Sequence, residues 1–388
     1  MRVTETELSG RLREVALLFL KLGATSFGGP AAYIGLMYHE VVQRRHWVDE
    51  QKFLDLVGAT NLIPGPNAAE VASHLGLIRA GRRGLIASGV LFILPGMFAT
   101  LIVAWAYVKY GSLPEVTWLL YGIKPVVIAI VIQALWNLGR TGIKGPSTVT
   151  VGISVAVLYL LGFNEIALLF AGAGFVVMVH SLRRFSKRGL SAMVTIPPLL
   201  AALPVTPYAA VVPFSQPTLF LTFLKIGSVL YGSGYVLLAF LRSAFVVDLG
   251  WLNNQQVLDA IAAGHITPGP VFSSATFVGY LVGGWPSALL ATLGIFLPSF
   301  LLVGLLSRIL PLLRKSPWSA AFLDGINAAS LGLMAGVTIQ LGRVAVVDVF
   351  TIVLTLCALF IVFRFRINSA WLILGGGLIG MVYKAVAG

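Results

Sequence analysis

The sequence predicts an all-α polytopic membrane protein made of two inverted repeats, each with about five spanning helices and a re-entrant helical hairpin that carries Pro-Gly-Pro. Three observations predict this fold class. The 388 residues are 58% hydrophobic and only 11% charged, with a mean hydropathy of +0.92. Several windows, such as 85–107, 119–138 and 346–362, approach or exceed the roughly 20 apolar residues that cross a hydrocarbon core. The third observation is that the chain repeats itself.

The repeat has a spacing of 204 residues. The Phe-Leu-Lys triplet at 19–21 recurs at 223–225, and the Pro-Gly-Pro triplet at 64–66 recurs at 268–270. From Pro95 and its counterpart Pro298 onward the offset is 203. So many matches in one register indicate a duplication. The predicted domains are an N-terminal repeat (1–182), a basic, proline-rich linker (183–216) and a C-terminal inverted repeat (217–388).

Each copy shows the same series of elements. In the first copy a glycine-interrupted segment (15–37) precedes two short helices (50–63 and 67–79) around Pro-Gly-Pro, and four apolar segments follow (84–108, 119–138, 147–162 and 164–182). The two helices around Pro-Gly-Pro are too short to cross a membrane. They predict a re-entrant hairpin, whose tip is tolerated only inside protein or beside water. Asp49 and Asn253 precede the first short helix of each copy and are expected to be N-caps.

Five crossings per copy would be an odd number, so the two copies are predicted to be inverted. On that assignment seventeen Lys and Arg residues fall on one side and seven on the other, and three lie within spans. The rich side would be cytoplasmic and both termini would face outward. If the first segment of each copy turned back instead, this count would make the copies parallel. The prediction is a multi-pass protein of the cytoplasmic membrane, surrounded by lipid.

Composition and motifs exclude other classes. The net charge of +13 lies in short clusters between apolar runs, as in cytoplasmic loops, so no nucleic-acid partner is expected. The single cysteine, Cys357, provides neither a disulfide framework nor a thiol metal site. The chain has no phosphate-binding loop, no dinucleotide fingerprint and no His/Cys ligand set, so we expect no cofactor and no enzyme activity.

Lys21 and Lys225 are cations inside apolar segments, at matching positions of the two copies. A charge in a membrane span usually marks a pathway or a ligand. The alternative for Lys21 is a side chain that extends to the headgroups. Because inverted copies would bring both ammonium groups toward a shared site, we favour a role in binding an anion.

Glycines and prolines mark the other candidate binding elements. A glycine site breaks the first segment of each copy. The two Pro-Gly-Pro tips each precede a short helix, whose free N–H groups and positive dipole end would attract an anion. Close helix packing and a purely structural turn are the respective alternatives. The candidate substrate-binding residues of this group are Gly28, Gly29, Gly232, Pro64, Gly65, Pro66, Pro268, Gly269 and Pro270.

The two hairpins differ in their polar residues. Asn61 in the first aligns with His265 in the second, and Asn67 follows the first tip directly. We expect all three to contact substrate. Glu70 is the only acid near the predicted site, so its carboxyl group could couple transport to protons. The alternative is that Glu70 pairs with His74 or with an arginine.

These motifs resemble the long-chain chromate ion transporter family. The resemblance rests on Phe-Gly-Gly-Pro at 27–30 after Leu-Lys-Leu-Gly, the Trp-Val-Asp-Glu stretch at 47–50, the paired Pro-Gly-Pro motifs, and Ala-Thr-Phe-Val-Gly-Tyr at 275–280. It covers nearly the whole chain. It implies a duplicated secondary transporter that expels chromate, with sulfate as a competing or alternative ligand.

The expected partners are therefore an inorganic oxyanion (chromate or sulfate), membrane lipid and a second copy of the chain in a homodimer. Uptake of sulfate or another oxyanion stays open as an alternative. A cation or metal exporter would use Glu70, His74 and His265, and inhibition by sulfate rather than by divalent cations would exclude it. A membrane enzyme would need a cluster of acids or histidines at one interface, which the sequence does not provide.

Overall fold

The computed structural model describes residues 5–27, 30–186, 212–231, 234–306, 316–365 and 367–387, and every regular element in these ranges is helical. The elements of the first half are α1 (Glu5–Thr25), α2 (Pro30–Tyr38), the π-helix η1 (His39–Arg44), α3 (Glu50–Thr60), α4 (Asn67–Tyr110), α5 (Pro114–Gly142), α6 (Pro146–Leu160) and α7 (Glu165–Ser186). Those of the second half are α8 (Gln216–Val229), α9 (Leu237–Leu241), η2 (Arg242–Asp248), α10 (Asn254–Ile266), η3 (Val271–Ser273), α11 (Ser274–Leu306), α13 (Pro317–Ala345), α14 (Val349–Phe365) and α15 (Ser369–Ala387). The predicted site residues Gly28, Gly29 and Gly232 and most of the predicted linker lie outside the described residues.

Within the described residues, six helical stretches are long and apolar enough to cross a membrane: α4, α5, α7, η3 together with α11, α13 and α15. Helices α6 and α14 are apolar but shorter. An α-helical, multi-pass membrane protein is therefore confirmed.

Corresponding elements of the two halves begin and end at nearly constant offsets. Helices α5 and α13 both start at a proline and are offset by 203 residues at each end, from 114 to 317 and from 142 to 345. The long helix of each half is kinked at the same place, because Gly81 and its counterpart Gly284 adopt positive φ angles of 64° and 73°. The short helices α3 and α10 are capped as expected, since the side chains of Asp49 and Asn253 accept hydrogen bonds from N–H groups in the first turn.

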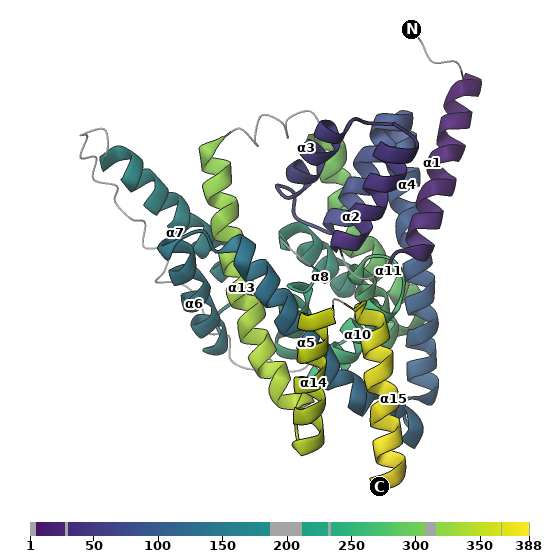
Figure 1. Cartoon of the computed structure of the whole chain (residues 1–388), viewed down its shortest axis with the longest axis vertical. Coiled ribbons are helices and arrows are strands. Elements are labelled where there is room, and N and C mark those ends of the chain that lie inside the picture. The colour runs from purple at the N-terminus through teal and green to yellow at the C-terminus, as the bar shows by residue number, and fades with distance from the viewer. Residues whose placement is uncertain are drawn as a thin grey trace.

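The first segment of each copy does not run as one span, which corrects the count of five crossings. Helix α1 ends at Thr25, and the chain continues through α2 from Pro30 and through η1 until Trp47 contacts α1 again. The indole Nε1 of Trp47 donates to Glu14 Oε1 at 3.1 Å. In the second half the indole of Trp251 donates to the Val212 carbonyl at 2.6 Å, just before α8. Each segment thus turns back, and the two termini lie at opposite ends of the long axis (Figure 1).

The halves interlock instead of lying side by side as separate bodies. Helix α5 packs against α14 and α15 of the other half, and α13 packs against α6 and α7. Helices α5 and α13 also pack against each other in antiparallel directions, with Gly142 beside Leu331 and Gly342 beside Ile128. Such reciprocal packing is the relation that a two-fold axis produces. Because the first segments turn back, the crossing count alone would make the two copies parallel, whereas the antiparallel packing of the equivalent helices α5 and α13 is the arrangement expected of inverted repeats. The inversion of the copies stays a proposal.

Candidate functional site

Each Pro-Gly-Pro tip docks on the opposite half of the molecule. The Gly65 N–H group donates to the Leu230 carbonyl at 2.8 Å, and the Gly269 N–H group donates to the Ser26 carbonyl at 2.9 Å. Ser26 and Leu230 are 204 residues apart, so the two contacts are equivalent. Gly65 and Gly269 have φ angles of 135° and 85°, in the region that favours glycine. Each tip thus contacts the chain just after the first long helix of the opposite half, α1 or α8.

The second tip is tightly enclosed. The Tyr33 hydroxyl donates to the Gly269 carbonyl at 2.7 Å. A Cβ atom on Gly96 of α4 would lie 2.5 Å from the Pro268 carbonyl oxygen, so the tip and α4 are in backbone contact. Pro268, Gly269 and Pro270 do not line the large cavity described below. This tip acts as a packed joint between α1, α2 and α4.

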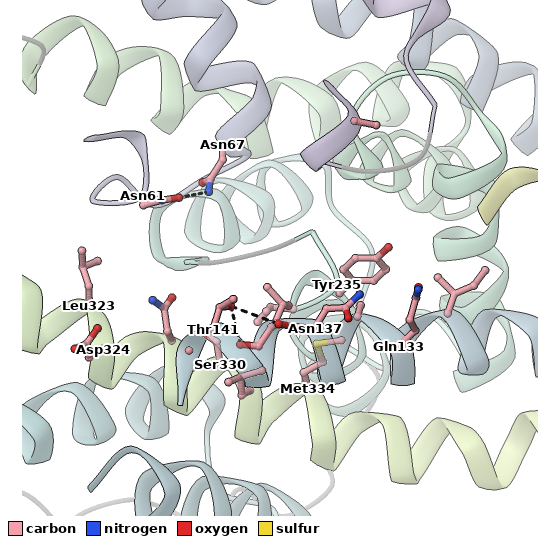
Figure 2. A pocket seen from close by; sticks show the side chains of 18 of the residues that line it. Asn61, Asn67, Gln133, Asn137, Thr141, Tyr235, Leu323, Asp324, Ser330 and Met334 are labelled. Carbon is pink, nitrogen blue, oxygen red and sulfur yellow. Dashed lines mark hydrogen bonds between the residues drawn. The ribbon is translucent and has the colours of Figure 1, made fainter. Parts of the chain in front are cut away.

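A cavity of about 1050 Å³ lies between the first hairpin, α5 and α13 (Figure 2). Asn61 and Asn67 reach it from the first hairpin, and the Asn67 amide donates to the Asn61 side-chain oxygen at 2.8 Å. Asn67 is the first residue of α4, and the first N–H groups of a helix have no acceptor within it. Pro64, Gly65 and Pro66 are buried behind these two asparagines. Of the predicted site residues that the structure describes, Asn61 and Asn67 line this cavity.

The long walls of the cavity come from two residue faces that the sequence analysis did not single out. Along α5, Gln133, Asn137 and Thr141 recur every four residues, which places them on one face of the helix. Along α13, which packs against α5, Asn327 and Ser330 also line the cavity. The available signal was this helical spacing of amides and hydroxyls within otherwise apolar spans.

Lys21 and Lys225 are not among the residues that line the cavity. The Lys21 ammonium lies 3.1 Å from Glu40 Oε1 and its side chain is 57% exposed. Lys225 is exposed as well, and it is close enough to Glu165 and Asp248 for electrostatic attraction to both carboxyl groups. The structure thus does not bring the two lysines together around the cavity, and their role in anion binding stays a prediction.

Glu40, the partner of Lys21, is the centre of an ion-pair cluster. Besides Lys21 it contacts the guanidinium groups of Arg44 and Arg45, and Glu14 bridges Arg45 to Arg79. Burial alone would raise the pKa of the Glu40 carboxyl. The hydrogen bonds from Lys21 and Arg45 outweigh burial, and the pKa lies below its ordinary value. The cluster ties α1, η1 and α4 together.

His265 and Glu70 are buried and do not line the cavity. The His265 ring stacks on Tyr235, with 5.1 Å between the ring centroids, and Tyr235 lines the cavity. One Glu70 oxygen accepts a hydrogen bond from the Ser299 hydroxyl at 3.1 Å. Within the described residues, the other Glu70 oxygen and His265 Nε2 have no hydrogen-bond partner. The observed partner of Glu70 is therefore the opposite half, through Ser299, and not His74 or an arginine.

Comparison with known proteins gives the family. The model of the chromate transporter family matches twice, at residues 13–178 and 217–381. The chain belongs to the chromate transporter family. It is 31% identical to a chromate transport protein of Cupriavidus metallidurans, over 96% of this chain and 93% of the relative. It is 33% identical to a probable chromate transport protein of Synechococcus elongatus, over 90% of this chain and 89% of the relative. No solved structure matches the chain.

The two family matches coincide with the two series of helices. The first match ends within α7 and the second begins at the start of α8. Both Pro-Gly-Pro tips and both walls of the cavity thus lie in segments that the chromate transporter family shares. As a member of a transporter family with several apolar spanning helices, the protein is a multi-pass membrane protein.

Proposed function

We propose that the protein is a secondary transporter that exports chromate from the cytoplasm and binds it in the cavity between α5, α13 and the first hairpin. The observation that carries this proposal is the chemistry of the cavity. Amides and hydroxyls from both halves converge there with the N-terminus of α4. Such donors can replace part of the hydration shell of a tetrahedral dianion. A midplane site at the interface of two repeats is also the usual plan of transporters with inverted repeats.

The opening of the cavity supports access from the cytoplasm. Asn137 and Thr141, near the end of α5, are exposed, whereas Ile130 deeper along the same face is buried. Because the first segment turns back, Arg11 and Arg13 lie on the same side as Arg79, which increases the excess of positive charge there. The side that is richer in arginine and lysine is cytoplasmic under the positive-inside rule. The cavity opens toward that side, near the end of α5 and the beginning of α13.

The asymmetry of the two hairpins supports alternating access. Helix α10 of the second hairpin packs against α5 and α15. Its counterpart α3 faces α13 across the cavity, with Gly58 in the cavity wall. The second hairpin thus packs through α10 against α5 and α15, whereas α3 of the first hairpin borders the cavity. Exchange of these two positions would close the present cavity and open an equivalent one on the other side, as inverted repeats permit.

Glu70 is the proposed coupling residue. It is fully buried, its second oxygen has no partner, and no cation lies within ion-pair distance of it in the described part of the chain. An unpaired carboxylate is costly in such a place, so a proton that neutralises it would stabilise the buried form. Because Glu70 contacts Ser299 on α11, a change in its charge would act on the joint between the halves.

Transport into inverted membrane vesicles tests the proposal. Vesicles that contain the protein should accumulate labelled chromate, and an imposed proton gradient should change the rate. Glu70→Gln should remove the effect of the gradient, whereas Glu50→Gln at an exposed position of α3 should not. Absence of chromate accumulation above empty vesicles would refute the proposed function. Sulfate accumulation in right-side-out vesicles, without chromate transport, would favour sulfate uptake instead.

A further inference from the structure

Two charged side chains of opposite sign face the cavity. Lys144, in the loop between α5 and α6, places its ammonium group 2.7 Å from Asp324 Oδ1 on α13. Both residues line the cavity, and they are the only charged residues among the described lining residues. The pair therefore connects the two long walls at the place where the cavity opens.

The geometry of the loop fixes the backbone of Lys144 but leaves its side chain free. The N–H groups of Lys144 and Gly145 both donate to the Thr148 hydroxyl, at 3.0 and 3.1 Å. The Lys144 side chain is 61% exposed and that of Asp324 is 24% exposed. An ion pair with such exposure contributes only about 0–1 kcal/mol. The ammonium group can thus change partners at little cost.

The pair has no counterpart in the other half of the chain. With the offset of 203, Lys144 corresponds to Val347, and Asp324 corresponds to Tyr121. The equivalent contact in that half is a hydrogen bond from the Tyr121 hydroxyl to Asp348 Oδ2, at 2.6 Å. The duplicated scaffold therefore does not require a lysine–carboxylate pair at this place, and its presence beside the polar cavity points to a role in what the cavity binds.

We propose that Lys144 is the first cationic contact of the oxyanion and that Asp324 is an internal competitor for it. The inference rests on the proposed function of the cavity. An entering dianion brings two negative charges and several acceptor oxygens to Lys144, whereas Asp324 offers one charge, so the dianion displaces the carboxylate. A monovalent anion has no such advantage over Asp324. The pair thereby selects divalent oxyanions and admits them by exchange of an ion pair.

The KM for chromate in inverted vesicles tests this exchange. Lys144→Gln should raise KM by about tenfold, the factor that corresponds to loss of a hydrogen bond to a charged group. Asp324→Asn should lower KM by about two- to fivefold, because the competitor for Lys144 is gone. It should also increase inhibition by nitrate, a monovalent oxyanion. In the double variant the effect of Asp324→Asn should vanish. Lys109→Gln, at an exposed lysine near the end of α4, serves as the control.

Two failures can be told apart. If the unaltered protein transports chromate but KM is the same in Lys144→Gln and Asp324→Asn, the inference is overturned and the proposed function stands. If the unaltered protein shows no saturable chromate transport, the proposed function is overturned together with the inference. Elution as a single peak in size-exclusion chromatography checks that each variant folds. Lys144→Arg, which keeps the charge, should restore a KM near that of the unaltered protein, and a tenfold rise there would also overturn the inference.

Discussion

The docked hairpin is held by a buried ion pair whose removal has a predictable cost. Lys124 of α5 lies 3.7 Å from Asp259 Oδ1 of α10, and the two side chains are 14% and 2% exposed. The Tyr107 hydroxyl donates to the other Asp259 oxygen at 2.9 Å. Removal of one member of a buried pair typically costs about 3–5 kcal/mol, because the remaining charge is uncompensated. Because the Lys124 side chain is not fully buried, we expect each single substitution to lower the free energy of unfolding by about 3 kcal/mol, the lower end of that range.

A double-mutant cycle isolates this energy. Asp259→Asn and Lys124→Met each leave one buried charge, whereas the double variant has neither charge and keeps an acceptor for the Tyr107 hydroxyl. We therefore expect the double variant to lie within about 1 kcal/mol of the unaltered protein, which gives a strongly non-additive cycle.

The assay is thermal unfolding of the purified protein in detergent, followed by size-exclusion chromatography. Both single variants should unfold at clearly lower temperature, and the double variant should recover most of the loss. Lys109→Met, at an exposed lysine near the end of α4, should change stability by no more than about 0.5 kcal/mol. If the double variant loses the sum of the two single losses, the two charges do not stabilise each other and the reasoning is wrong.

Two further predictions concern the joint and the ion-pair cluster. Gly96→Ala should abolish transport in vesicles, because the added Cβ atom would lie 2.5 Å from the Pro268 carbonyl oxygen. Gly35→Ala should leave the rate unchanged, because Gly35 has open space around it. Equal transport rates in the two variants would contradict the packed joint. The lowered pKa of Glu40 means that its charge stabilises the fold fully above the ordinary carboxyl pKa and that this contribution is lost as the pH falls through the lower folded pKa. Glu40→Gln should therefore reduce the melting temperature at neutral pH. Between about pH 5 and pH 3 the melting temperature of the variant should fall less than that of the unaltered protein. An equal fall in both proteins would show that protonation of Glu40 is not linked to unfolding.

The candidate site was only partly predictable from the sequence. The position of Asn61 and Asn67 beside a Pro-Gly-Pro tip predicts a role in the site, and both residues line the cavity. Lys21 is a cation in an apolar segment, which predicts a binding role, but its partner Glu40 lies nineteen residues away, beyond a turn that hydropathy does not reveal. Lys144 and Asp324 are 180 residues apart, and no local pattern connects them. The polar residues of α5 and α13 line one cavity only because these two helices pack together in the folded chain.

The sequence alone determined the features that depend on neighbouring residues. Apolar runs set the membrane-spanning helices, proline and glycine set the ends of the hairpin helices, and the repeat set two equivalent series of elements, because each signal is local along the chain. Only the tertiary structure decided that the first segment of each copy turns back, since contacts such as Glu14 with Arg79 hold it there. It also decided that each tip docks on the other half, and that one hairpin is docked while the other borders a cavity. Those outcomes depend on contacts between distant residues, and two nearly equivalent copies can adopt different positions without any change in local sequence signals.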